Sequence, residues 1–199
     1  MVAAVGVVVT SPIVLVGALA VKLDSPGPAF YRSTRVGLHG RTFFMYKLRS
    51  MRAGADAQGP AVTVDADPRV TRVGRVLRRL KIDELPQLVN VVKGDMSLVG
   101  PRPEAPEYVK LYTPEQRRVL DVRPGITGEA VTVYVDEESM LTGADAEATY
   151  RDKVMQEKLA LDLDYVRHQG FGRDMRILVR TAGLLVRRGA SARRPSPPR

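Results

Sequence analysis

Cysteine is absent from the 199 residues, and the chain has only two histidines, His39 and His168. Without thiols the protein has no disulfide framework, no thiolate zinc site and no cysteine nucleophile. Two imidazoles are too few for a metal centre built on a histidine cluster. We therefore expect carboxylates to be the ligands of any bound ion.

Acidic side chains are fewer than basic ones. The chain has 31 Lys and Arg against 22 Asp and Glu, which gives a net charge of +9. The last thirteen residues hold more than half of this excess in five arginines, Arg187, Arg188, Arg193, Arg194 and Arg199. Such a balance predicts an anionic partner, and the phosphates of nucleic acid, of anionic lipid and of a nucleotide substrate all satisfy it.

The length and the composition, with 44% hydrophobic and 27% charged residues, predict one compact domain with appendages. They exclude a large multidomain enzyme and a polytopic membrane protein. The first 21 residues carry no charged side chain and predict a membrane segment. As a helix they would measure about 32 Å, enough to cross a hydrocarbon core of about 30 Å. A cleaved signal peptide is the alternative, but the basic residues that open such peptides are missing.

Ser11 and Pro12 interrupt the middle of this apolar run. Proline removes an amide donor and crowds the carbonyl one turn earlier, so we expect a bend, where a serine hydroxyl can satisfy a freed backbone group. The bend either returns the helix to the face that it entered, as a re-entrant helix, or is an ordinary kink in a spanning helix. Basic residues from Lys22 onward place the following domain on the cytoplasmic side in both cases.

The rest of the chain predicts a helix-rich α/β domain. The turn residues of Asp24–Pro28 end the apolar helix, and short apolar and aromatic pieces within residues 30–51 favour a hairpin. The composition of residues 53–67 indicates a surface loop. Apolar residues at helical spacing predict a basic amphipathic helix over 72–80.

A mixture of apolar and basic residues between 173 and 188 is typical of an amphipathic helix at a membrane interface. Ordinary packing against the domain is the alternative.

Asp83 and Glu84 are adjacent carboxylates at the expected start of a second helix, with basic residues just before them. The cations and the positive helix end predict that both are ionised and able to bind Mg²⁺ or attack phosphorus. In the structural alternative, which spacing alone favours, Asp83 is the N-cap and Pro86 lies in the first turn. The glycines and prolines around Arg102 imply a stiff loop that can present its guanidinium to phosphate.

Five segments occur in an order that carries a specific resemblance: Asp24–Pro28, Tyr46–Met51, Ile82–Leu88, Gly94–Pro103 and Val122–Gly128. Together they resemble the bacterial polyprenyl-phosphate phosphoglycosyl transferases, the small monotopic bacterial sugar transferases. The resemblance runs from the apolar N-terminus to about Arg188. It implies a re-entrant helix broken at a Ser-Pro pair, the place that Ser11 and Pro12 occupy, and a small cytoplasmic catalytic domain.

The resemblance also implies a reaction, the transfer of a sugar 1-phosphate from a UDP-sugar to undecaprenyl or another polyprenyl phosphate, with release of UMP and a requirement for Mg²⁺. Asp83 matches the nucleophile that carries the phosphosugar covalently, and Glu84 matches its metal-associated partner. Four cations match positions that contact phosphates or the lipid headgroup, with pairing to structural acids as the alternative: Lys47, Arg78, Arg102 and Arg123. Asp162 matches an acid of a late family motif, with a solvated helix surface as the alternative.

The resemblance divides the chain into a membrane-embedded helix at 1–22, a catalytic domain at 23–188 and a basic, disordered tail at 189–199. It places the domain on the cytoplasmic face of the bacterial inner membrane, with UDP-sugar, polyprenyl phosphate and membrane lipids as partners. No nucleic acid is expected as a partner, and an oligomer is compatible with the sequence. The acidic insertion within Glu129–Tyr150 departs from many relatives and leaves the sugar open.

Two other classes stay open. A noncatalytic membrane scaffold would keep the fold without the reaction. A membrane-tethered nucleic-acid-binding protein would explain the basic excess, because neutralising phosphates requires Lys and Arg. Aromatic residues are only 6% of the chain, however, and no recognised nucleic-acid-binding module is present.

Overall fold

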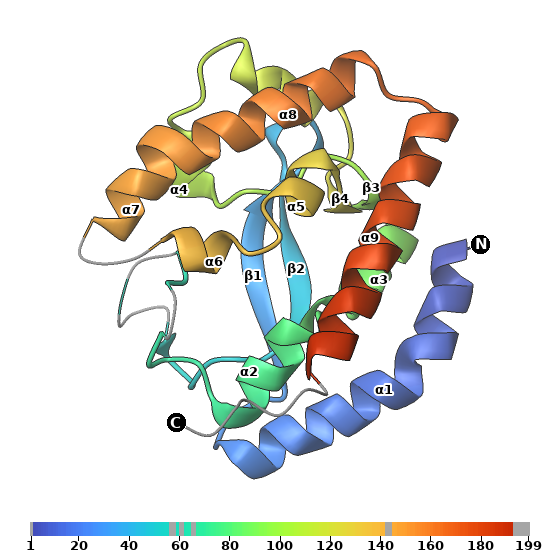
Figure 1. Ribbon diagram of the computed structural model, residues 1–199, viewed down its shortest axis with the longest axis vertical. Helices are drawn as coiled ribbons and strands as arrows, with labels where there is room; N and C mark the ends of the chain where they lie inside the picture. Colours follow the sequence, from blue (N-terminus) through green and yellow to red (C-terminus); the bar gives the residue numbers. More distant parts are fainter. Residues whose placement is uncertain (1, 56–58, 60–61, 65–66, 142–144, 193–199) are drawn as a thin grey trace.

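The computed structural model describes residues 2–55, 59, 62–64, 67–141 and 145–192. Helices surround two small sheets (Figure 1). The strands are β1 (Phe30–Val36), β2 (Thr42–Leu48), β3 (Ser97–Val99) and β4 (Gly125–Thr127). The α-helices are α1 (Val2–Asp24), α2 (Arg72–Arg79), α3 (Gln87–Lys93), α4 (Pro106–Val109), α5 (Glu129–Val133), α6 (Glu137–Met140), α7 (Ala146–Thr149), α8 (Met155–Arg167) and α9 (Phe171–Ala192). Shorter turns are η1 (Leu38–Gly40), η3 (Ile82–Glu84), η4 (Gln116–Asp121) and the π-helical η5 (Tyr150–Val154). The predicted helix-rich α/β class is confirmed.

The β1–β2 hairpin forms the centre of the domain. The two strands are antiparallel, with Phe30 opposite Leu48 and Val36 opposite Thr42, as the pattern of residues 30–51 predicted. Along β1 the odd-numbered side chains are half-buried and the even-numbered ones are exposed up to Thr34, because successive residues of a strand face opposite sides. One face of β1 therefore points into the domain.

A second, parallel sheet connects the C-terminal helices to the centre. Its strands β3 and β4 pair Ser97 with Gly125 and Val99 with Thr127. Ile177 of α9 is buried against this sheet in a cluster with Val99 and Tyr165. The long helix α9 thus packs on the domain along one side, which is the alternative that the sequence left open.

Helix α1 bends near its middle (Figure 1). Pro12 has no amide hydrogen to donate to the carbonyl of Val8, and the Ser11 hydroxyl donates to that carbonyl at 2.8 Å, as expected. Among the described residues, α1 is the one helix whose length and apolar composition would allow it to cross a membrane. Only 11% of its most apolar stretch is buried. The predicted membrane segment is therefore present as an exposed apolar helix, which ends at Asp24 where the turn was expected.

Both halves of α1 contact the domain. A Cβ atom at Gly6 would lie 3.4 Å from Leu88 of α3, so the first half lies against that helix. In the second half, Val21 is buried in a cluster with Leu48 of β2 and Leu77 of α2. The two arms on either side of the bend consequently rest on the same body.

Helix α2 lies directly on the backbone after β2. A Cβ atom at Gly74 would be 1.9 Å from the carbonyl oxygen of Ser50, a contact that no side chain allows. The Thr71 hydroxyl caps the helix by accepting a hydrogen bond from the Gly74 amide at 2.9 Å. This close approach fixes the first turn of α2 against the backbone that follows β2.

Two segments differ from expectation. Residues 53–67 lie partly outside the described residues, but Val62 is buried in the main core, so the segment is not wholly a surface loop. The Arg69 guanidinium contributes to this burial by donating to the Val62 carbonyl at 3.2 Å. In the expected tail, residues 189–192 continue α9, and residues 193–199 lie outside the described residues.

Candidate active site

Asp83 and Glu84 lie in the turn η3, between α2 and α3. Lys81 has a left-handed backbone, with φ of 57° and ψ of 20°, which ends α2 and starts the turn. The two helices therefore meet at the acidic pair, as the apolar stripes predicted. Helix α3 begins only at Gln87, after Pro86, so neither acid is its N-cap and the structural alternative for Asp83 is wrong.

The Asp83 carboxyl is buried, and its Oδ1 has no hydrogen-bond partner among the described residues. Burial and the neighbouring Glu84 charge raise the pKa of Asp83, against the opposing charges of Lys47 and Lys81. The direction of this shift is opposite to the one expected from the cations, and the ionised state of Asp83 stays a prediction. Removal of water outweighs the cations, and α3 starts too late to contribute its positive end.

Glu84 is held by a bidentate ion pair. Arg102 donates from Nη2 to Oε1 at 2.8 Å and from Nη1 to Oε2 at 3.2 Å, and Lys81 Nζ lies 3.6 Å from Oε1. Burial opposes ionisation of Glu84, but the charges of Arg102, Lys81 and Lys47 outweigh it and hold the pKa well below its usual range. Here the expectation of an ionised carboxylate is confirmed.

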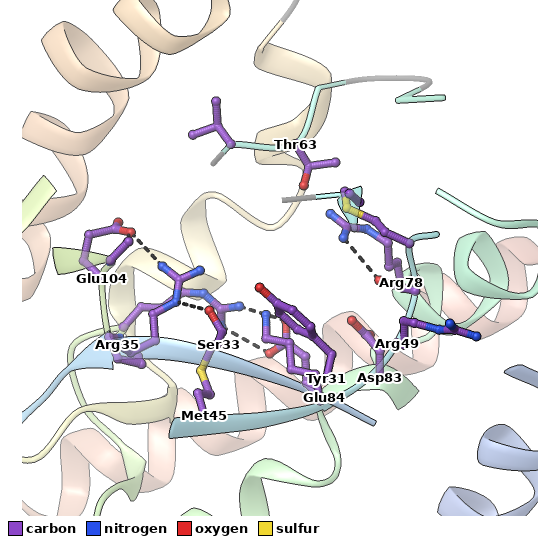
Figure 2. A pocket seen from close by; sticks show the side chains of 18 of the residues that line it. Tyr31, Ser33, Arg35, Met45, Arg49, Thr63, Arg78, Asp83, Glu84 and Glu104 are labelled. Carbon is purple, nitrogen blue, oxygen red and sulfur yellow. Dashed lines mark hydrogen bonds and ion pairs between the residues drawn. The ribbon is translucent and has the colours of Figure 1, made fainter. Parts of the chain in front are cut away.

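The acidic pair lines a cavity of about 1050 Å³, at the upper end of the range for ligand pockets. Figure 2 shows Asp83 and Glu84 on its floor, between Arg78 on one side and Arg35 with Glu104 on the other. The half-buried face of β1 supplies Tyr31, Ser33 and Arg35 to the same cavity. The cavity thus brings the two carboxylates together with cations from β1, β2, α2 and the loop after β3.

Three of the four expected phosphate-binding cations line this cavity, namely Lys47, Arg78 and Arg102. Burial lowers the pKa of Lys47 to about 8, partly offset by the charge of Glu84. Arg78 donates to the Ser50 hydroxyl at 3.4 Å and pairs with Glu138. Pairing with acids, the alternative raised from the sequence, therefore holds for Arg78 and for Arg102.

Arg123 is placed elsewhere. It is not among the residues that line the cavity, and its Nε donates to the Gly94 carbonyl at 2.9 Å. Its expected contact with a phosphate stays a prediction.

Asp162 of α8 is buried, so the alternative of a solvated surface position is wrong. Its carboxylate accepts hydrogen bonds from the backbone amides of Arg102 and Ala130, while its Oδ1 has no partner within the described part of the chain. Burial raises the pKa of Asp162 to about 7 against these bonds and the charge of Lys158. Asp162 therefore contacts the backbone of Arg102 and lies outside the cavity lining, and its expected role stays a prediction.

Sequence reasoning missed an ionic network at the far side of the cavity. Arg35 pairs with Glu104 at 3.0 Å, and Lys158 pairs with Glu137 at 2.8 Å. The Tyr150 hydroxyl connects the pairs by donating to Glu104 and accepting from Lys158. The alternation along β1 could have indicated that Arg35 faces the domain. No local pattern in the sequence predicts the contact between Glu104 and Tyr150, which are 46 positions apart.

Asp83 and Glu84 are adjacent carboxylates in the cavity and can supply oxygen ligands to a metal. Among the described residues no group of three or more His, Asp or Glu side chains is arranged to hold an ion alone. Mg²⁺ commonly binds one or two carboxylates together with substrate phosphates. The unpartnered Oδ1 of Asp83 and the lone pairs that Arg102 leaves on Glu84 fit an ion held in that way.

Known proteins resemble the chain over nearly its whole length. A UDP-glucose:undecaprenyl-phosphate glucose-1-phosphate transferase from Caulobacter vibrioides is 44% identical over 179 residues, which cover 88% of this chain and 63% of the relative. A UDP-N-acetylgalactosamine-undecaprenyl-phosphate N-acetylgalactosaminephosphotransferase from Aeromonas hydrophila is 41% identical, over 86% of this chain and 38% of the relative. The exopolysaccharide production protein PSS from Rhizobium leguminosarum is 40% identical, over 91% and 89%.

The chain thus spans less than two thirds of the Caulobacter and Aeromonas relatives and most of the Rhizobium one. The sequence profile of one family, described as bacterial sugar transferase, matches residues 1–188. That match covers the bent apolar helix, the acidic pair and the cavity around it. The chain belongs to the bacterial sugar transferase family.

Proposed function

We propose that this protein transfers a sugar 1-phosphate from a UDP-sugar to a polyprenyl phosphate, undecaprenyl phosphate in the first instance, and releases UMP. The observation that carries the proposal is the buried carboxyl of Asp83, whose Oδ1 has no partner among the residues that the structure describes, in a cavity lined by Lys47, Arg78 and Arg102. A carboxylate that attacks a diphosphate is repelled unless cations neutralise the phosphates. The named activities of relatives at about 40% identity support the same reaction class.

The proposed reaction has two displacements at one phosphorus atom. An Asp83 oxygen bonds to the phosphorus that carries the sugar, while the bond from that phosphorus to the bridging oxygen breaks and UMP leaves with the electron pair. A phosphate oxygen of the polyprenyl phosphate then bonds to the same phosphorus, and the bond to Asp83 breaks. Asp83 is restored, and neither displacement consumes a proton. Dividing the transfer in this way lets both phosphate substrates use the same cations in turn.

The side chains around Asp83 have different electrostatic roles in the proposed reaction. Arg102 keeps Glu84 ionised through its bidentate pair. Lys47 and Arg78 line the cavity where the phosphates would lie, and Asp162 fixes the backbone of Arg102. Glu84, with the orphaned oxygen of Asp83, would hold Mg²⁺, which when bound supplies positive charge to the diphosphate.

A re-entrant placement of α1 on the cytoplasmic face of the inner membrane is part of the proposal. Both arms of α1 rest on the same domain, at Leu88 and at Leu48, which supports a helix that returns to the face it entered. Several of its outward side chains are strongly exposed, with Val8 at 71% and Val16 at 70%. On α9, Val179 is 73% exposed although Ile177 is buried, consistent with an interfacial helix that also packs on the domain.

UMP release tests the proposed function directly. The full chain in detergent, with Mg²⁺ and undecaprenyl phosphate, is assayed with a panel of UDP-sugars. We expect release with at least one donor, loss of release on chelation of Mg²⁺, and loss in Asp83→Asn. Asp121→Asn is the matched control, because Asp121 is exposed and outside the cavity lining. No release with any donor, or unchanged turnover in Asp83→Asn, would overturn the proposal.

A further inference from the structure

The cavity extends past the acidic pair in two directions that differ in charge. Figure 2 shows Arg49 and Arg78 beyond Asp83 on one side, and Arg35 with Glu104 beyond Glu84 on the other. All of these residues line the cavity. A diphosphate substrate that reacts at Asp83 would therefore have a different environment on each side of the attacked phosphorus.

The cationic end consists of Arg49 and Arg78. Arg49 donates to the Ser25 carbonyl and hydroxyl, at 2.7 and 2.9 Å, and to the Pro26 carbonyl. These acceptors are neutral, and the charge of Asp24 compensates that of Arg49 only in part, without an ion pair among the described residues. Arg78 pairs with Glu138, whose side chain is 49% exposed and so largely screened by water. Both arginines also have a buried Nε without a hydrogen-bond partner among the described residues. This end carries net positive charge and suits an anion.

The charge-balanced end has as many acids as bases. Its four charged side chains keep between 10% and 25% of their surface exposed and line the cavity: Arg35, Glu104, Glu137 and Lys158. Each cation is paired with one carboxylate, and the Tyr150 hydroxyl joins the two pairs. Such a network offers donors and acceptors in fixed positions but no net charge for an anion. It suits a neutral ligand rich in hydroxyl groups.

The two ends match the two sides of a nucleotide sugar. This step rests on the proposed function, in which Asp83 attacks the phosphorus that carries the sugar. The neutral sugar is bonded to that phosphorus through one oxygen and stays attached, whereas the second, anionic phosphate is bonded through the bridging oxygen and departs with UMP. We infer that the charge-balanced end binds the hexose of the donor and sets donor preference, and that the cationic end binds the phosphate of the departing nucleotide.

The position of Glu137 agrees with this assignment. It lies on α6 and lines the cavity, where its carboxylate pairs with Lys158 at 2.8 Å. The relatives named above carry different sugars, glucose in one and N-acetylgalactosamine in another. The two named donors share UDP and differ only in the hexose, so donor preference depends on the end of the cavity that binds the hexose.

Neighbouring glutamates on α6 provide the test, because Glu137 belongs to one end and Glu138 contacts the other. Glu137→Gln keeps the shape but removes the charge that pairs with Lys158. The full chain is assayed for kcat/KM with UDP-glucose, UDP-galactose and their two N-acetylated counterparts, and for inhibition by UMP. We expect the ratio between the best and second-best donors to change by about tenfold, with UMP inhibition unchanged.

Glu138→Gln is the matched variant. It frees Arg78, so we expect UMP to inhibit more strongly while the donor ratios stay as in the wild type. Arg35→Lys is a second probe of the charge-balanced end, in which the charge remains but the fork to Glu104 and Ser33 is lost. It keeps the test decisive if Glu137→Gln does not fold, and we expect it to change the donor ratios as well.

Two results with the folded Glu137→Gln or Arg35→Lys variants would overturn the inference. The first is an unchanged ratio of kcat/KM between donors. The second is a loss of UMP inhibition as large as the loss of donor turnover. The second result would mean that the charge-balanced end binds the nucleoside and not the hexose. Failure of the proposed function is distinct, because the wild type would then release no UMP from any donor.

Discussion

Replacing Arg102 with methionine removes the bidentate partner of Glu84 and leaves a buried carboxylate under-compensated. Breaking a buried pair by removing one partner costs about 3–5 kcal/mol. Lys81 remains 3.6 Å from the same carboxylate, and Arg102 is itself 24% exposed, so part of the charge stays neutralised. We therefore expect a loss of about 2–3 kcal/mol, which lowers the melting temperature by roughly 4–12 °C for a chain of this size.

Thermal unfolding in detergent, followed by circular dichroism, measures this loss. The Arg102→Met change is combined with Glu84→Gln in a double-mutant cycle, and Arg117→Met, at an exposed position, is the control. Because Arg102 lowers the pKa of Glu84 in the folded state, its stabilisation is present above pH of about 4.5 and disappears as the pH falls. Equal melting of the Arg102 and Arg117 variants at pH 7, or a coupling energy near zero, would refute the reasoning.

Three further predictions follow from buried or bent positions. Burial raises the pKa of Asp162 to about 7, so this carboxyl should contribute a loss of up to about 4 kcal/mol of stability as the pH rises from 4 to 7, and Asp162→Asn should lack that part of the pH dependence in the same denaturation series. Gly74→Ala should destabilise by on the order of 4 kcal/mol because its Cβ would strike backbone, whereas Gly183→Ala, with nothing within 4 Å, should be neutral or stabilising. The chain has no cysteine, so Val2→Cys reports topology cleanly: an impermeant maleimide should label it from the same membrane side as Asp121→Cys, and labelling from opposite sides would show a spanning helix.

Local patterns in the sequence predicted the local structure well. Apolar spacing placed a helix on each side of Asp83 and Glu84, and the aromatic pieces of residues 30–51 gave the hairpin. The hydrogen bond from Ser11 to the Val8 carbonyl follows from proline chemistry alone. These features depend on residues close together in the chain, where period and backbone donors decide the outcome.

Features that depend on burial could not be read in this way. The basic residues before Asp83 suggested an easily ionised carboxyl, but packing around η3 removes water from it and raises its pKa. The burial of Asp162 depends on where α8 lies against the Arg102 loop. The charge-balanced end joins β1, the segment before α4, α6 and α8, and only the tertiary fold brings these pairs together.

Covalent trapping on Asp83 tests the central claim most directly. The purified chain is incubated with an accepted UDP-sugar and Mg²⁺ but without polyprenyl phosphate, then denatured and measured by intact mass and peptide mapping. We predict a mass increase of one sugar phosphate, located on Asp83 and discharged when undecaprenyl phosphate is added before denaturation. A protein that turns over with acceptor yet never carries sugar phosphate on Asp83 would contradict the account, because the transfer would then be direct.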